Sequence, residues 1–587
     1  MIPAPREEEF HHGAARRSRS VPRNATRYLC AAAYVEPGFA DRAIAELIEA
    51  EHRAVVPAYG HDVEPVLLHC LRSRRLALAR DAALTLALLA GLWLLPGPTA
   101  VVLCAALVLG AAGWTRRQRL LPTWKVVAGA VVALVLLSFV GAPLAGILAM
   151  FGVSVDDLLG TGPEGYTAPG YPSPEPADAQ SVPFVLQLAL VVIVVGGILL
   201  TYYRVRVATV AVTLAPGARH VPPRIDHERI AERVRAVAAA QHGNVVMHAG
   251  FEPFLGAGRR LHAWSMVLEL RNEQSPLSNG GARRRVDVDP VELNRHLKRR
   301  LAELRSDKLP ERERVAGLAL RDYVIATGYR NYQFPLIDLD SRTPFAFAGP
   351  DAVNAVIRHP QGAARHFLRV TTGTEGHAVV DDSGYELLPA QDQEIEVSAF
   401  VHAAVEGGML YLEFVATRLG PLRESLHEID TVGSDAVDVN YRAFLDALRN
   451  FGADLAFSPY RFVRNSVNII ATPFRMNRSA TDSGEPAFNF GARESLREML
   501  AEPSPSTYTA DLDAVKYRKL FERRVTDAVL DYLESQHIDT SEYRARVNVL
   551  HNEGTILQNS TVNGAVAGGQ GSHATASAPV PAPTTGR

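Results

Sequence analysis

The sequence predicts an α+β protein in which a four-helix transmembrane region, arranged as two hairpins, is joined to a mixed α+β cytoplasmic domain. Four strongly apolar blocks lie within residues 82–203 of the 587-residue chain, whose overall hydrophobic content of 47% is ordinary for a soluble protein. Beyond residue 203, segments with helical periodicity are interspersed with segments of alternating polarity. The charge is nearly balanced, at 61 Lys and Arg against 63 Asp and Glu, which argues against a globally basic nucleic-acid binder.

Changes of composition divide the chain into five parts. The N-terminal residues are polar and rich in arginine, and they show no cleavable signal peptide. The last residues are mostly small, which is typical of disordered chain. The predicted parts are a disordered N-terminus (1–25), a small cytoplasmic α/β segment (26–81), the transmembrane region (82–203) with an external loop (151–182), a cytoplasmic α+β domain (204–550) and a disordered low-complexity tail (551–587).

The small segment before the membrane region combines both kinds of pattern. Residues 27–33 and 52–56 are short apolar runs that we expect to form strands. Residues 37–50 carry apolar side chains at helical spacing. Residues 62–80 predict a second helix, which leads directly into the first apolar block.

The first two apolar blocks predict a helical hairpin. Ala82–Leu95 and Thr99–Trp114 flank the turn-forming sequence Pro96-Gly97-Pro98. Both blocks are shorter than the ~20 residues of a comfortable membrane span. Two interpretations follow: a tight transmembrane hairpin, which we favour, and a re-entrant hairpin that dips into one leaflet.

The other two blocks are long enough to cross a bilayer. Val126–Met150 contains no charged residue, and Pro143 inside it predicts a kink. Pro183–Tyr203 has Gln187 as its one strongly polar side chain. The absence of charge within these segments argues against a pump or a channel, because ion pathways generally carry intramembrane charges.

Charged residues orient this region. Arginines precede the first block, lie between the second and third, and follow the fourth, whereas residues 151–181 contain no Lys or Arg and five acidic residues. The positive-inside rule then places both termini in the cytoplasm and residues 151–181 outside. We therefore expect a multi-pass protein of the plasma membrane with the lipid bilayer as its first partner.

The cytoplasmic domain shows alternating helical and extended segments. Its clearest feature is a hairpin, with strongly alternating residues 394–405 and 409–419 on either side of Gly407-Gly408. Further strands are expected at residues 205–214, 321–328 and 364–371, and helices at 222–241, 290–304, 441–451, 493–500 and 511–535.

Residues 244–270 predict a strand, a glycine-rich loop and a second strand. The loop ends in Gly256, Gly258, Arg259 and Arg260, which are weak candidates for binding an anionic cofactor. It lacks the Lys-Ser/Thr of a P-loop and the dinucleotide spacing, so a structural turn is the favoured interpretation and anion binding the alternative. We find no catalytic motif, no metal-ligand spacing among three separated cysteines, and no cofactor signature.

Two blocks carry a resemblance to known proteins. The sequences PFLGAG and HAWSMVLEL within residues 244–270, and YLCAAAYVEPGFADRAI at residues 28–44, resemble uncharacterised multi-pass integral membrane proteins of actinobacterial type. The resemblance implies a bacterial plasma-membrane protein and no activity. Residues 555–567 loosely resemble bacterial amyloid signalling motifs, with an inert tail as the favoured alternative.

These observations predict a membrane-anchored cytoplasmic binding or signalling scaffold. Its expected partners are a second copy of the chain or other proteins, which would bind through the cytoplasmic domain, and no nucleic acid is expected. The alternative is a membrane-tethered enzyme that acts on a nucleotide or a phospholipid head group and contacts phosphate through residues 250–260.

Overall fold

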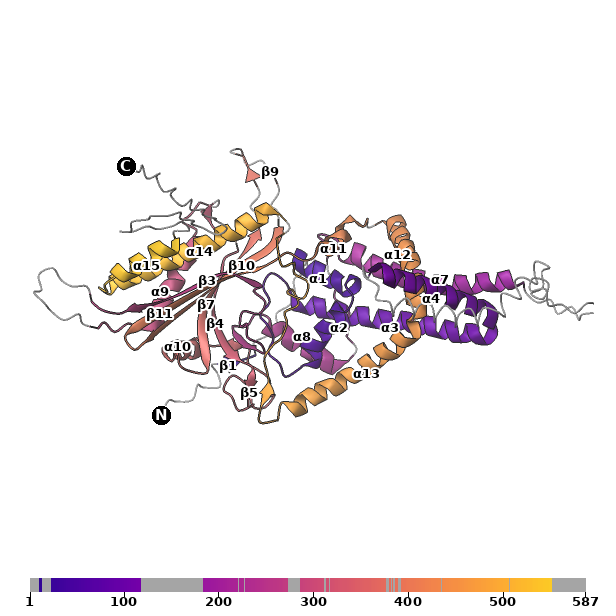
Figure 1. Cartoon of the computed structure of the whole chain (residues 1–587), viewed down its shortest axis with the longest axis horizontal. Coiled ribbons are helices and arrows are strands. Elements are labelled where there is room, and N and C mark those ends of the chain that lie inside the picture. Colours follow the sequence, from indigo (N-terminus) through magenta and orange to yellow (C-terminus); the bar gives the residue numbers. More distant parts are fainter. Residues whose placement is uncertain are drawn as a thin grey trace, which may run out of the picture.

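The computed structural model shows an elongated molecule with a sheet domain at one end and long apolar helices at the other (Figure 1). The predicted third apolar block, Val126–Met150, the external loop and most of both terminal segments lie outside the described residues. The structure describes residues 10–12, 23–117 and 183–551, apart from positions 220, 226, 273–284, 311–312, 316, 376–378, 382, 384–385, 389–391, 434 and 506.

A six-stranded mixed sheet forms the centre of the sheet domain. The hairpin predicted around Gly407-Gly408 is confirmed, and both glycines adopt positive φ angles, of 62° and 84°. One pair of strands, β2 and β4, is parallel, and the other four pairs are antiparallel. In spatial order the strands are β2 (Val245–His248), β4 (Ala319–Thr327), β7 (Ala364–Glu375), β10 (Asp392–Glu406), β11 (Met409–Leu419) and β3 (Arg259–Glu269).

Helices cover the sheet because successive strand residues point to opposite faces and both faces are apolar. On β10, Val397, Ala399 and Val401 belong to one core, which they share with α9 and α14, whereas Phe400 belongs to a core on the other face. The covering helices are α9 (Pro290–Ala302), α10 (Pro350–Arg358), α14 (Tyr508–Ser535) and α15 (Ser541–His551), with a 3-10 turn η4 (Glu303–Arg305). Short strand pairs lie outside the main sheet: β1 (Phe10–His11) with β6 (Phe347–Ala348), β5 (Tyr329–Arg330) with β12 (Phe488–Asn489), and β8 (Val379–Val380) with β9 (Glu386–Leu388).

Residues 23–62, which precede the first long apolar helix, form helices joined by turns and irregular chain. The expected strand at 27–33 is wrong, because these residues lie in α1 (Asn24–Val35), and residues 52–56 form turns without a strand. Nearly every side chain of α1 is buried, so the helical periodicity that would have identified it is absent from the sequence. Other elements that contribute to this core are α2 (Phe39–Ile44), the π-helical turn η2 (Ala45–Glu49) and α8 (Glu228–Ala240).

Two described helices are long and apolar enough to cross a membrane: Val63–Leu94, which is α3, and Phe184–Thr213, which joins α7 (Phe184–Ala208) to the π-helical turn η3 (Thr209–Thr213). Only 17% of the most apolar 18-residue stretch of each helix is buried inside the molecule. A third helix, α4 (Pro96–Arg117), begins with the Pro-Gly-Pro sequence directly after Leu95 and has a shorter apolar part. A four-helix transmembrane region is thus not confirmed, and the strand expected at 205–214 is wrong because α7 and η3 continue through it.

The chain returns to the apolar helices after the sheet. Following α11 (Glu424–His427) and the turn η6 (Glu428–Thr431), α12 (Ala436–Ala456) crosses α4 and α7, and α13 (Ser458–Asp482) runs back along α3 towards β5 (Figure 1). Helix 441–451 is confirmed as the middle of α12, whereas α13 was not predicted. The helix expected at 493–500 is wrong, because that segment forms turns.

Candidate functional site

The junction between the apolar helices and the rest of the molecule begins with a close helix crossing. A Cβ atom added to Gly452 of α12 would lie 2.6 Å from Cβ of Leu109, 2.7 Å from the backbone N of Gly110 and 2.8 Å from the carbonyl O of Ala106. The two helix backbones can approach this closely only because small residues face each other, as in many membrane helix pairs. The crossing therefore fixes α12 against α4.

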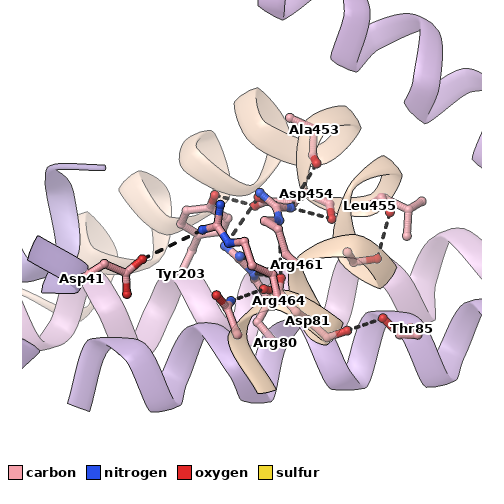
Figure 2. A network of polar contacts seen from close by, with 12 residues as sticks. Asp41, Arg80, Asp81, Thr85, Tyr203, Ala453, Asp454, Leu455, Arg461 and Arg464 are labelled. Carbon is pink, nitrogen blue, oxygen red and sulfur yellow. Dashed lines mark hydrogen bonds and ion pairs between the residues drawn. The ribbon is translucent and has the colours of Figure 1, made fainter. Parts of the chain in front are cut away.

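Four mutually paired charges lie beside this crossing, and we call them the junction cluster: the buried acids Asp81 and Asp454 and the partly buried Arg80 and Arg461 (Figure 2). Oδ1 of Asp81 lies 2.8 Å from Nη2 of Arg80 and 3.7 Å from Nε of Arg461. Oδ1 of Asp454 lies 3.4 Å from Nη1 of Arg80 and 3.0 Å from Nη2 of Arg461. Each acid thus contacts both arginines, and two positive charges balance two negative ones.

Neutral donors complete the hydrogen bonding of the two acids. The Tyr203 hydroxyl donates to Oδ2 of Asp454 at 2.6 Å, and the Asn465 amide donates to Oδ2 of Asp81 at 3.1 Å. Asp81 is fully buried. Burying a carboxylate is costly unless it is paired and hydrogen-bonded, and both conditions are met here. The junction cluster therefore joins α3, α7, α12 and α13 in one polar centre.

A second group of contacts continues this junction along α13. Glu49 of η2 accepts hydrogen bonds from Nη1 of Arg475 at 2.9 Å and from the Thr472 hydroxyl at 2.8 Å. Arg74 of α3 lies 3.7 Å from the same carboxylate. Nearer the junction cluster, Asp41 lies 3.9 Å from Arg464 (Figure 2). These contacts hold α13 against α3 and η2 over much of its length.

On the other side of α12 lies an apolar groove of about 630 Å³. Every residue that lines it is apolar, as expected of a surface that contacts hydrocarbon. The lining comes from α4 (Val101, Val102, Ala105, Leu109), α7 (Leu188, Val192, Ile193, Gly196, Gly197, Leu199, Leu200) and α12 (Phe444, Ala447, Leu448, Phe451).

The glycine-rich loop selected from the sequence lies away from this junction, where it leads into β3. Gly256 and Gly258 both have a φ of +80°, and the backbone N–H of Gly258 donates to Oε1 of Glu498 at 2.9 Å. Burial raises the pKa of Glu498 above its usual range. The loop therefore already holds a carboxylate of its own chain, which favours the interpretation as a structural turn.

The basic end of the loop faces solvent. Arg259 is exposed, and the guanidinium of Arg260 pairs with the carboxylate of Glu252 at 2.8 Å. A Cβ on Gly258 would lie 2.1 Å from the carbonyl O of Arg418, so glycine is required there by the neighbouring strand. Within the described part of the chain, no group of three or more His, Cys, Asp or Glu side chains is arranged to hold a metal ion.

The junction cluster was missed from the sequence, although two signals pointed to it. Arg80-Asp81 stands directly before an apolar block within one helix, and such a pair needs buried partners if the helix is enclosed. Residues 457–481 contain four arginines and no acidic residue, with apolar residues at helical spacing. Neither signal identifies the distant Asp454, which only the fold brings into contact.

The fold and the junction together define the class: an α+β sheet domain attached to long, exposed apolar helices through a charged, buried interface. Comparison with known protein families gives a match over part of the chain. Residues 263–566 match the model of a family described as AbeC-like domain, and the match covers just over half of the chain. The chain belongs to this family.

The family match includes the α12–α13 segment and the sheet except for β2 and the first residues of β3, but none of the three apolar helices. Its description names no activity, which fits the expected uncharacterised family. An actinobacterial origin and a multi-pass membrane character stay predictions. No curated protein and no solved structure matches the chain.

Proposed function

We propose that this protein is an integral plasma-membrane protein that acts as a membrane-anchored cytoplasmic binding or signalling scaffold. In this proposal α3, α4 and α7 form the anchor, and the AbeC-like domain meets partners at the inner face of the membrane. The observation that carries the proposal is the junction cluster, because it connects the apolar helices to α12 and α13 of the family domain through buried, mutually paired charges.

Exposed apolar surface supports the anchor. Leu86 and Trp93 of α3 and Ile193 of α7 are each more than 60% exposed, and each belongs to a helix with a long apolar stretch. Soluble monomers rarely expose a continuous apolar surface of this kind. A lipid bilayer is the environment that would cover it.

The position of the hairpin turn supports the spanning version of the first hairpin. A Cβ added to Gly97, in the first turn of α4, would lie 3.4 Å from the ring of Phe184 at the beginning of α7. At the other end, the guanidinium of Arg80 lies over the ring of Tyr202 near the end of α7, 4.6 Å from its centroid. The hairpin thus extends as far along the bundle as α7 does, which favours a full crossing over a shallow re-entrant loop.

Cysteine labelling tests the anchor and its orientation. In a Cys104→Ala background, Gly97→Cys should react with a membrane-impermeant maleimide in intact spheroplasts. The control Asp307→Cys, an exposed position of the sheet domain, should react only after permeabilisation. Labelling of Gly97→Cys only after permeabilisation, or release of the whole chain by alkaline carbonate, would contradict the proposal.

The scaffold part is tested by affinity purification of the full chain in mild detergent. We expect a reproducible set of stoichiometric protein partners that is recovered in smaller amount from Arg461→Met, because loss of one member of the junction cluster weakens the attachment of the domain to the anchor. Purification without any stoichiometric partner would argue for the alternative, a membrane-tethered enzyme. That alternative draws no support from the glycine-rich loop, whose backbone donor is engaged by Glu498.

A further inference from the structure

A charged cleft lies where the end of α13 meets η2 and the segment after β12. Its volume of about 430 Å³ falls within the range of small-molecule sites. Three separate parts of the chain form its walls, and each contributes arginine. The arginines are Arg42, Arg53, Arg475, Arg478 and Arg493.

We propose that this cleft binds a phosphate-bearing small molecule, and that Arg53 and Arg493 are its principal ligands. The proposal concerns a site separate from the junction cluster and does not depend on the membrane anchor. A soluble phosphate compound is favoured over a lipid head group because the cleft lies at the C-terminal end of α13, and this end is away from the apolar ends of α3, α4 and α7 (Figure 1).

The charges in the cleft are unequally partnered. Glu49 is hydrogen-bonded to Arg475, and Asp482 and Glu494 lie 3.6 and 3.9 Å from Arg478 and Arg42. Each acid therefore already has a cationic neighbour. The fourth acid, Glu46, accepts the backbone N–H of Arg493 at 2.7 Å and lies 3.5 Å from Nη1 of Arg53.

This arrangement leaves two guanidiniums under-satisfied. Among the described residues, the side chain of Arg493 has no hydrogen-bond or ion-pair partner, and Nε of Arg53 is buried without a hydrogen bond. Arg53 and Arg493 line the same cleft, and burial and then the positive charge of Arg493 lower the pKa of Arg53, as expected where one cation repels another. A bridging phosphate would satisfy both groups and remove the repulsion, because guanidinium and phosphate form strong charge-assisted hydrogen bonds.

Local structure supports a site at this place. The π-helical turn η2 contributes Glu46 and Glu49 to the wall, and π-helical turns occur frequently at functional sites. The ring of Phe488 forms part of the opposite wall and is only half-buried. An aromatic wall beside paired arginines suits a phosphate compound that also carries a flat group, such as a nucleoside phosphate.

Calorimetry on the full chain in mild detergent at low salt tests the site with pyrophosphate, ATP and adenosine. We expect saturable binding of pyrophosphate and ATP and none of adenosine. Arg493→Gln should weaken binding at least about tenfold, as expected for loss of one guanidinium–phosphate contact. It should leave the melting temperature of the free protein unchanged, because this side chain contacts no described acceptor.

The matched control is Arg523→Gln, which removes an exposed arginine of α14 paired with Asp527. It should bind both phosphate compounds with wild-type affinity. ATP binding tighter than pyrophosphate would identify a nucleoside phosphate, and equal affinities would identify the phosphate alone as the recognised group; both support the site. No binding at concentrations on the order of 10 mM, or equal weakening by both variants, would overturn it.

Discussion

The junction cluster and an ion pair at the sheet are built differently. In the junction cluster each acid contacts two arginines, so every charge has two partners of opposite sign. Arg497 and Glu396 of β10 form a single pair, with 2.5 Å between Nη1 and Oε1, which we call the sheet pair. Both side chains of this sheet pair are nearly fully buried.

The sheet pair also has incomplete hydrogen bonding. Within the described chain, Nε of Arg497 and Oε2 of Glu396 have no hydrogen-bond partner, although Arg497 also donates to the carbonyl groups of Tyr59 and Glu394. A shared network can lose one member and keep its remaining charges paired, whereas a single pair cannot. The difference teaches that the number of oppositely charged partners, as well as burial, decides how sensitive a charged side chain is to mutation.

The largest effect is therefore expected at the sheet pair. Arg497→Met leaves the buried carboxylate of Glu396 without a cation and should lower the free energy of unfolding by about 4 kcal/mol. Urea unfolding of the full chain in mild detergent measures this. The double variant Glu396→Gln with Arg497→Met should recover part of the loss, and a single variant within about 1 kcal/mol of wild type would contradict the account.

A smaller loss is expected at the junction cluster. Asp81→Asn keeps the shape of the side chain, and Arg80 and Arg461 both retain Asp454. We expect a loss of about 2–3 kcal/mol together with faster proteolysis between α12 and α13, because the cluster then carries one excess buried charge. A loss equal to that of Arg497→Met would show that the shared network gives no protection.

The sequence could predict those parts of the structure that depend on local patterns, and it could not predict contacts between distant residues. The hairpin of β10 and β11, strand β4 and helix α14 were predicted because their patterns are local: alternation, a Gly-Gly turn and helical spacing. Helix α1 was mistaken for a strand because burial on all sides removes periodicity. The junction cluster joins residues more than 370 positions apart, and no local pattern encodes such a contact.

The sheet pair also predicts a dependence of stability on pH. His61 is buried next to it, and burial followed by the charge of Arg497 lowers the pKa of His61 to about 4. Between this value and the ordinary pKa of about 6.5, the unfolded chain binds a proton that the folded protein does not. Stability should therefore fall as the pH falls, by about 2 kcal/mol between pH 7 and pH 5.

The variant His61→Gln isolates this contribution. Other groups titrate in both proteins, so the quantity to compare is the difference between wild type and variant at pH 7 and at pH 5. The wild type should lose about 2 kcal/mol more than the variant over this range. Parallel pH profiles would show that His61 takes up its proton in the folded state.

The smallest expected effect separates backbone strain from contact with the sheet pair. Gly60 and Gly217 have nearly the same positive φ, 73° and 72°, so replacing either by alanine costs a similar strain of about 1–2 kcal/mol. A Cβ on Gly60 would lie 2.0 Å from Oε1 of Glu396, whereas none of the described atoms lies within 4 Å of one on Gly217. Gly60→Ala should therefore be less stable than Gly217→Ala by roughly 1 kcal/mol, the size of a modest overpacking penalty. Equal losses would mean that Glu396 and Arg497 can move aside, and the sheet pair would then be as adaptable as the shared network at the junction.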